Sequence, residues 1–231
     1  VLEIQRGCMR GCRFCQAGYV YRPLRERKPE TLLSLADNLL SCSGYDEISL
    51  SSLSTSDFGG LPELTDGLLK MTEEKKIGLS LPSLRIDNFS LELMEKVQKV
   101  RKSGITFAPE AGTQRLRDVI NKNITEENIL SSTKLLFNGG WTNVKLYFMI
   151  GLPTETDTDV CGIAELAGKV LDVYFQTPKE ERAKNINITV STSSFVPKPF
   201  TAFQWVAMDS RDELIRKQKL IKESIPAKRI R

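Results

Sequence analysis

The stretch over residues 7–15, Gly-Cys-Met-Arg-Gly-Cys-Arg-Phe-Cys, decides how the rest of the chain is interpreted. It places Cys8, Cys12 and Cys15 at the spacing C-x3-C-x2-C. Thiolates this close together can surround one small metal centre, and iron–sulfur clusters take thiolate ligands. Because a 4Fe–4S cubane has one more iron than this motif has thiolates, one iron is left for another ligand.

Zinc and chance are the two alternatives for these cysteines. A structural zinc site needs about four nitrogen or sulfur ligands. The chain has no His, and Cys42 and Cys161 lie alone and far along the sequence. The iron–sulfur interpretation is therefore favoured, and Cys42 and Cys161 are expected to be buried cysteines of helices.

Composition indicates a globular protein. The chain has 231 residues, of which 40% are hydrophobic and 27% charged, and we expect a single α/β domain over residues 1–231. No apolar run reaches about 18 residues, so no membrane span is expected. The clustered cysteines favour the reducing cytoplasm over a disulfide framework. The chain does not begin with Met, so we expect a fragment of a longer protein.

The net charge of +4 is unevenly distributed. Residues 6–28 contain seven basic residues and one acidic residue, and residues 211–231 contain eight basic and three acidic residues. One interpretation is solvated loops, a basic terminal helix and surfaces that contact other domains. The alternative is an anionic substrate such as RNA or a phosphorylated metabolite.

Short apolar runs alternate with longer amphipathic segments, which predicts repeated strand–helix units. The predicted strands cover residues 1–5, 47–51, 78–81, 105–108, 143–150 and 186–191. The predicted helices cover residues 29–41, 61–75, 91–102, 113–120 with 126–137, 158–176 and 212–225. This order favours parallel strands with right-handed crossovers, in an open doubly wound sheet or in a barrel-like array. In both, the site lies at the carboxyl ends of the strands.

The cysteine motif, with Phe14 just before its last cysteine, resembles the signature of the radical S-adenosylmethionine (SAM) superfamily. Residues 2–8, Leu-Glu-Ile-Gln-Arg-Gly-Cys, and the run from Gln16 to Pro23 resemble an uncharacterised bacterial branch of it. Members of that branch carry a cobalamin-binding-like domain in front of the radical SAM core. The resemblance implies a partial (β/α)6 TIM-like barrel, and so favours the barrel-like array over the open doubly wound sheet.

The resemblance also implies the cofactors. Cys8, Cys12 and Cys15 would hold a 4Fe–4S cluster, and SAM would bind the remaining iron through its amino and carboxylate groups. An electron from a reductant such as flavodoxin or ferredoxin would then cleave SAM to methionine and a 5′-deoxyadenosyl radical. The catalytic side chains stay unassigned, and cobalamin would enter through a domain outside this chain.

Candidate SAM-binding residues follow the second and third predicted strands. The Ser-rich segment after strand two offers small hydroxyls, and the resemblance implies that Ser52 and Ser54 lie near the amino group of SAM. The Gly-Gly-Glu motif usual at this position is not intact. Arg85 follows strand three and could face SAM or the substrate, or could instead pair with Asp87 or Glu110.

Later strand ends supply the other candidates. Residues 110–125 resemble a stretch of the methylthiotransferase, elongator and coproporphyrinogen oxidase branches, which implies that Glu110 contacts ribose or methionine. Lys122 would contact the methionine carboxylate, unless it is simply solvated. By the same resemblance Phe14, Ile150 and Val196 would surround the adenine.

The sequence is thus interpreted as a radical SAM enzyme with an unknown substrate, and methylthiolation or methylation of RNA is one option. A methylthiotransferase should carry a second cluster on upstream cysteines, and none is visible here. The alternative is a non-catalytic iron–sulfur protein for electron transfer or a scaffold. Glu155 and Thr156 are expected to cap the following helix rather than to take part in chemistry.

Overall fold

The computed structural model describes residues 1–73, 75–81, 85–86, 104–180 and 182–231. The chain forms two compact units. Unit 1 contains Val1–Arg10 and Val20–Ser103, and unit 2 contains Gly11–Tyr19 and Gly104–Arg231. The expectation of a single domain stays a prediction.

Unit 1 is built on a small parallel sheet with the strand order β1-β4-β5. Its strands are β1 (Leu2–Glu3), β4 (Glu47–Ser51) and β5 (Gly78–Ser80). Leu2 pairs with Leu50, and Ile48 pairs with Leu79. A short antiparallel hairpin of β2 (Gln5–Arg6) and β3 (Arg25–Glu26) follows directly after β1.

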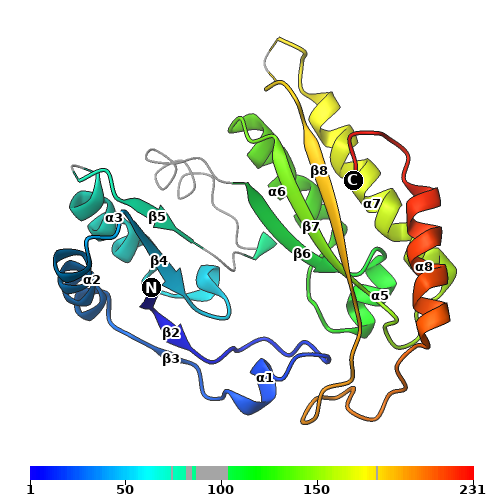
Figure 1. Ribbon diagram of the computed structural model, residues 1–231, viewed down its shortest axis with the longest axis horizontal. Coiled ribbons are helices and arrows are strands. Elements are labelled where there is room, and N and C mark those ends of the chain that lie inside the picture. The colour runs from blue at the N-terminus through cyan, green and yellow to red at the C-terminus, as the bar shows by residue number, and fades with distance from the viewer. Residues whose placement is uncertain (74, 82–84, 87–103, 181) are drawn as a thin grey trace. The chain divides into compact units, whose positions relative to one another are not determined.

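Two helices pack against this sheet, α2 (Pro29–Ser43) and α3 (Leu61–Thr72), and the short 3-10 helix η1 (Thr55–Asp57) lies between β4 and α3 (Figure 1). Both helices carry a proline in their first turn, where its missing N–H costs no hydrogen bond. Gly44 ends α2 in the left-handed conformation, with φ of 67°. Leu32, Leu64 and Leu68 are fully buried between these helices and the sheet, which defines the core of unit 1.

Unit 2 contains a second parallel sheet, in which β7 (Asn143–Ile150) lies between β6 (Ile105–Glu110) and β8 (Asn187–Ser194) (Figure 1). The β7–β8 register runs without a break from Asn143 opposite Asn187 to Ile150 opposite Ser194. The β6–β7 register shifts between Phe107 and Glu110, at the carboxyl end of β6. Every second residue of β7 is buried, as expected for a strand with one face in a core.

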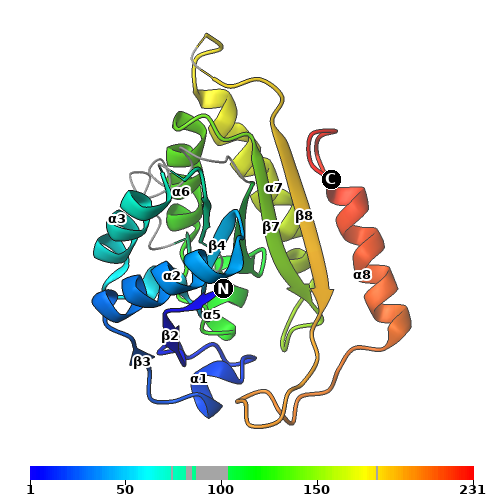
Figure 2. The same cartoon turned by 60° about the vertical axis from the view of Figure 1, so that its left-hand side comes forward.

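Helices of unit 2 begin with side-chain caps. The helices are α5 (Gln114–Val119), α6 (Glu126–Asn138), α7 (Asp157–Gln176) and α8 (Arg211–Ser224). Thr113, Thr125, Thr156 and Ser210 each accept a hydrogen bond from a backbone N–H of the first turn. Because α7 contacts β7, β8 and both α6 and α8, it is the central helix of the unit (Figure 2).

The last residues of the chain add to the free edge of β8. Ile230 forms a parallel bridge with Ile188, and Val190 donates its N–H to the Arg231 carbonyl at 2.7 Å. A pocket of about 330 Å³ begins beside Arg231, between β8 and α8, with Thr192 and Ile221 among its lining residues. The edge of β8 beyond Val190 therefore faces this pocket.

Most predicted elements are confirmed, with boundaries within a few residues. The predicted helix over 91–102 lies outside the described residues. The predicted first strand is shorter than expected and turns into the β2–β3 hairpin, which the sequence did not predict, and neither did it predict α1 (Ala17–Val20). Cys42 is exposed on α2, so its predicted burial is wrong, while Cys161 is partly buried in α7. None of the described helices is long and apolar enough to cross a membrane.

Candidate functional site

None of the three motif cysteines forms a disulfide, and each is partly buried. Cys8 belongs to unit 1, whereas Cys12 and Cys15 belong to unit 2. The Arg10 N–H donates a hydrogen bond to Cys8 Sγ at 3.4 Å. The described residues include no group of three or more His, Cys, Asp or Glu gathered for a single metal ion. Since a cubane takes its thiolates on different irons, three cysteines at this spacing that form no disulfide fit a 4Fe–4S cluster.

The segment with Cys12 and Cys15 is fixed to the loop after α5. Asn121 Nδ2 donates to the Gly11 carbonyl at 2.8 Å, and the Arg13 N–H donates to the Ile120 carbonyl at 3.0 Å. The Cys15 N–H closes a tight turn on the Cys12 carbonyl at 3.1 Å. These bonds place two cysteines beside the loop that carries Lys122.

Phe14 lies against an apolar cluster of unit 2. The buried members of this cluster are Ala111, Leu116, Ile120, Leu152, Phe195 and Phe203. Met149 packs against the same cluster as Phe14, so the ring lies in the region where β7 and β8 end. The structure thus brings Phe14 near the segments that carry Ile150 and Val196, as the adenine assignment requires.

Glu110 and Lys122 form an ion pair, with Lys122 Nζ 3.0 Å from Glu110 Oε1. Their side chains are only 17% and 11% exposed, so Lys122 is not the solvated side chain of the alternative. Glu110, the last residue of β6, has φ of 69°, and Asn121 and Asn123 beside Lys122 have φ of 54° and 51°. Left-handed backbone at residues with side chains is uncommon and is concentrated at functional sites.

A fully buried arginine, Arg117, organises the segment between Glu110 and Lys122. Its guanidinium donates to four acceptors, which are the carbonyls of Ala111, Gly112 and Ile124 and Oε1 of Gln114. Burial lowers the pKa of Arg117 below its usual range. The sequence interpretation missed this residue, although its spacing from Ile120 places it on the buried face of α5.

Ile150 is the last residue of β7, and Val196 follows the end of β8 by two residues. The Ile150 carbonyl accepts the Phe195 N–H at 2.8 Å. Ile150 is fully buried, and Val196 is half exposed. The bond from Phe195 therefore brings the segment that carries Val196 to the end of β7.

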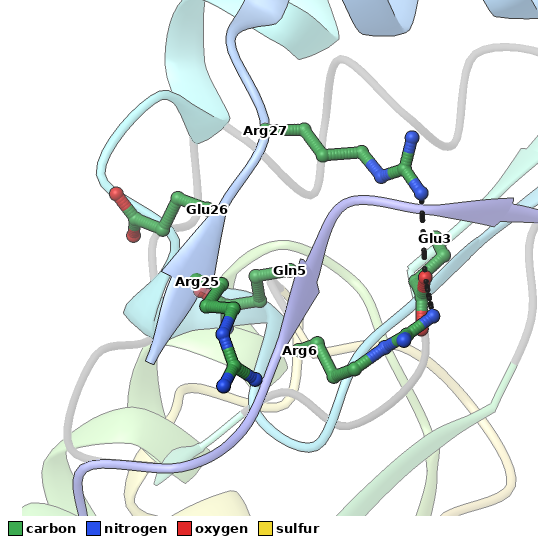
Figure 3. Close-up of a pocket in the computed structure, with 6 residues that line it drawn as sticks. All are labelled: Glu3, Gln5, Arg6, Arg25, Glu26 and Arg27. Carbon is green, nitrogen blue, oxygen red and sulfur yellow. Dashed lines mark hydrogen bonds and ion pairs between the residues drawn. The ribbon is translucent and has the colours of Figure 1, made fainter. Parts of the chain in front are cut away.

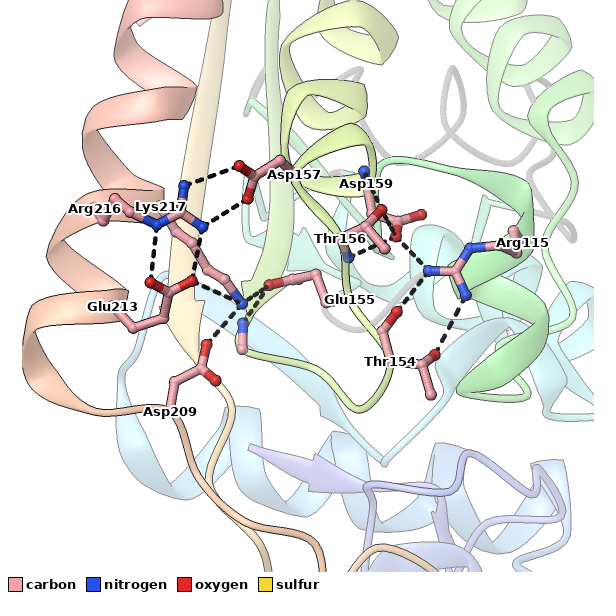
Figure 4. A network of polar contacts seen from close by, with 11 residues as sticks. Arg115, Thr154, Glu155, Thr156, Asp157, Asp159, Asp209, Glu213, Arg216 and Lys217 are labelled. Carbon is pink, nitrogen blue, oxygen red and sulfur yellow. Dashed lines mark hydrogen bonds and ion pairs between the residues drawn. The ribbon is translucent and has the colours of Figure 1, made fainter.

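The turn after β7 contains a buried ion network (Figure 4). Thr156 caps α7 as predicted, in a capping box with Asp159. Glu155 does not act as a cap: its Oε2 accepts the Gly151 N–H at 2.7 Å and Lys217 Nζ at 2.8 Å. Burial raises the pKa of Glu155 above its usual range, against the effect of these donors.

Asp159 links α7 to the turn after β6. It accepts hydrogen bonds from Thr113, Arg115 and Thr156, and it is almost completely buried. Burial opposes its charge, but the three donors outweigh burial and lower the pKa of Asp159 to about 2. The turn that follows Glu110 is therefore held against α7 by a charged group.

In unit 1 the predicted serines bond to their own loop. Ser52 Oγ lies 3.0 Å from Thr55 Oγ1, and Ser54 Oγ donates to Asp57 Oδ2 at 2.7 Å. Asp57 also forms an ion pair with Arg10, a residue of the cysteine loop. Burial opposes the charge of Asp57, but the donors Arg10 and Ser54 lower its pKa. The sequence interpretation missed this pair, because its members are far apart in sequence.

Arg85, the third candidate in unit 1, lies close to this loop. Its N–H donates to Ser56 Oγ at 2.9 Å, and its charge adds to the lowering of the Asp57 pKa. Asp87, its alternative partner, lies outside the described residues.

An arginine-rich pocket of about 310 Å³ lies at the β2–β3 hairpin of unit 1 (Figure 3). Its lining residues are Glu3, Gln5, Arg6, Arg25, Glu26 and Arg27. Glu3 accepts from Arg6 at 2.8 Å and lies 3.6 Å from Arg27, so two of the three guanidinium groups share one carboxylate. The arginine-rich pocket retains a positive balance that suits an anionic group.

Comparison with known proteins gives one family match. The model of the radical SAM superfamily matches residues 2–167. An uncharacterized protein of Methanocaldococcus jannaschii is 35% identical over the whole chain, which covers 48% of that protein. The tRNA-2-methylthio-N(6)-dimethylallyladenosine synthase of Clostridium novyi is 30% identical over 68% of the chain and 36% of the synthase.

Among solved structures, the methyltransferase TsrM of Kitasatospora setae, with cobalamin and a [4Fe-4S] cluster bound, has a TM-score of 0.64 at 12% identity. The match covers 88% of this chain and 38% of TsrM, which shows that the fold is shared. The chain thus spans about half the length of the archaeal relative and less of the others.

Proposed function

Because this chain belongs to the radical SAM superfamily, we propose that it is a radical SAM enzyme in which Cys8, Cys12 and Cys15 hold a 4Fe–4S cluster that binds SAM. When bound and reduced, the cluster supplies an electron that splits SAM into methionine and a 5′-deoxyadenosyl radical, which then acts on the substrate. The C-x3-C-x2-C motif, with three partly buried cysteines that form no disulfide, is the observation that carries this proposal.

The polar candidate residues are proposed to bind the methionine half of SAM. Lys122 offers its ammonium to the carboxylate of SAM, and Glu110 accepts from the ribose or methionine end. Their ion pair places both groups at one strand end before SAM arrives. Ser52, Ser54 and Arg85 of unit 1 are proposed for the amino group and for the polar rim of the site.

The apolar candidate residues of unit 2 are proposed to bind the adenine half of SAM. Phe14, Ile150 and Val196 offer one ring, one buried aliphatic side chain and one half-exposed aliphatic side chain. Such surfaces exclude water from a planar base and fix its orientation. The hydrogen bond between Phe195 and Ile150 supports a fixed arrangement of this surface.

The deciding experiment is anaerobic reconstitution with iron and sulfide, followed by dithionite and SAM, with 5′-deoxyadenosine measured by chromatography. The wild-type protein should form the nucleoside, and Cys12→Ala should lose both the cluster absorbance and the nucleoside. Cys42→Ala, at an exposed cysteine outside the motif, is the matched control and should retain both. Wild-type protein that holds a cluster but forms no 5′-deoxyadenosine would support the electron-transfer or scaffold alternative.

RNA methylthiolation or methylation is the substrate reaction that we propose. It is supported by the name of the Clostridium relative, by the radical SAM methyltransferase fold of TsrM and by the arginine-rich pocket. A flavodoxin or ferredoxin is the proposed reductant. Cobalamin, bound in the TsrM structure, is proposed as a cofactor only through a further domain. Mass spectrometry of unmodified tRNA after incubation with full-length enzyme should reveal added methyl or methylthio groups, and unchanged tRNA would contradict the proposal.

A further inference from the structure

Lys217 on α8 is a buried ammonium that contacts carboxylates from two different loops (Figure 4). Its Nζ lies 2.8 Å from Glu155 Oε2 and 2.7 Å from Asp209 Oδ2. The side chain of Lys217 is 7% exposed and that of Glu155 is 1% exposed. Burying a lysine is costly, so its partners must compensate the charge.

One of these loops is the turn after β7. Glu155 accepts the Gly151 N–H at 2.7 Å, so the ammonium of Lys217 acts through Glu155 on the residue directly after Ile150. Gly151 has φ of 81°, which a residue with a Cβ rarely adopts. The direction in which the chain leaves Ile150 is therefore fixed by the contact between Lys217 and Glu155.

The other loop follows β8, where it includes Val196 and continues to Asp209. A Cβ at Gly151 would lie 3.1 Å from Asp209 Oδ2, so the two loops approach each other directly at this point. Lys217 Nζ lies between their carboxylates and neutralises a repulsion between them. Burial lowers the pKa of Lys217, but Asp209 and Glu155 outweigh burial and hold it above its usual range.

We propose that Lys217 is a positioning residue for the adenine half of SAM, because it fixes the loops that carry Ile150 and Val196 in one arrangement. This inference rests on the proposed function, in which both residues contact adenine. Lys217 acts through Glu155 and Asp209, with which it pairs, and is not proposed to contact SAM itself. Networks of buried charges that are fully paired favour one arrangement over its alternatives.

The test compares ligands that contain adenine with one that does not. On the cluster-containing, anaerobic protein, the dissociation constants of SAM, 5′-deoxyadenosine and methionine are measured by calorimetry. Lys217→Met should raise the dissociation constants of SAM and 5′-deoxyadenosine by about tenfold or more, which corresponds to the loss of one oriented contact. Methionine should bind within about twofold of wild type, because its partners lie on other segments.

Two further variants keep the test valid if Lys217→Met does not fold. Asp209→Asn removes one carboxylate and leaves Lys217 paired with Glu155, so the variant should fold. It should show the same selective loss of affinity for SAM and 5′-deoxyadenosine, but a smaller one. Lys219→Met, on the same helix but with a side chain 76% exposed, is the matched control and should bind all three ligands as wild type does.

Two results would overturn the inference. In the first, folded Lys217→Met and Asp209→Asn bind 5′-deoxyadenosine as tightly as wild type. In the second, the two variants lose affinity for methionine and for 5′-deoxyadenosine equally, which would indicate a general loss of structure. Failure of the proposed function looks different, because the wild-type protein itself would then bind neither SAM nor 5′-deoxyadenosine.

Discussion

Lys122 is the residue whose charge has the most direct expected effect on SAM binding. Its ammonium is partly buried and already oriented by Glu110. Lys122→Met should weaken the binding of SAM by about tenfold or more, because a charge-assisted contact to the carboxylate of SAM is lost. Lys122→Arg should retain most of the affinity. Equilibrium binding checks this, with Lys134→Met, at an exposed lysine of α6, as the control. Equal affinity for Lys122→Met and wild type would remove Lys122 from the site.

Asp159 gives a prediction for acid stability. Its pKa is lowered to about 2 from 3.8, so its ionised form stabilises the folded state above the unfolded pKa. This contribution, about 2 kcal/mol, should be lost as the pH falls from about 4 toward 2. Asp159→Asn should therefore be less stable than wild type at neutral pH, and the difference should shrink in acid. Urea unfolding at several pH values measures it, and a constant difference would contradict the assignment.

Only some of the charged residues around the candidate site could be predicted from the sequence. Glu110 and Lys122 were predicted, because the family resemblance gives their positions. Arg117, Lys217 and Asp57 were not predicted, since a charged side chain in an amphipathic pattern is normally assigned to the exposed face. The partners of Arg117 lie within seven residues of it, whereas Lys217 pairs with Glu155 and Asp57 pairs with Arg10 across long stretches of sequence that only the fold brings together.

At the scale of elements, the turn after β6 packs against α7 without room for a side chain. A Cβ at Gly112 would lie 2.3 Å from the Ile163 nitrogen and 2.4 Å from the Gly162 carbonyl carbon. Gly112→Ala should destabilise the protein by about 3 kcal/mol, because backbone atoms must move. Gly104→Ala is the control, since its nearest neighbours are 3.7 Å away. Thermal unfolding compares the two, and equal melting temperatures would show that the turn can shift freely.

Elements with a strong local pattern were predicted well. The alternation of Val144, Leu146, Phe148 and Ile150 gave β7 with its observed boundaries. Thr125 followed by acidic residues gave the start of α6. The hairpin of β2 and β3 has two residues in each strand, too few to show a period. Cys42 was expected to be a buried helix cysteine, but it lies in the last turn of α2, where the chain is exposed.

At the scale of the whole molecule, part of the basic charge is already paired. Arg6, Arg10 and Arg27 contact carboxylates of unit 1, and Arg216 and Lys217 contact carboxylates of unit 2. The uneven charge of the sequence therefore overstates the positive surface offered to RNA. Long-range attraction depends on the charges that stay unpaired and exposed.

Arg25 and Lys28 are exposed, and no ion pair involving them is found in the part of the chain that the structure describes. If RNA is the substrate, Arg25→Gln with Lys28→Gln should weaken RNA binding and reduce the slope of log K against log salt by about 2. Lys219→Gln with Lys222→Gln on α8 provides a charge-matched control. Filter binding at several salt concentrations measures the slopes, and an unchanged slope would place the RNA surface elsewhere.

The pairing of Ile230 and Arg231 with the edge of β8 has a practical consequence for protein engineering. Whatever is joined after Arg231, natural chain or added reporter, starts from a segment already aligned with β8, and its first residues would lie beside the pocket that Thr192 lines. A glycine–serine spacer, which has little preference for extended pairing, should keep such an attachment from perturbing the sheet.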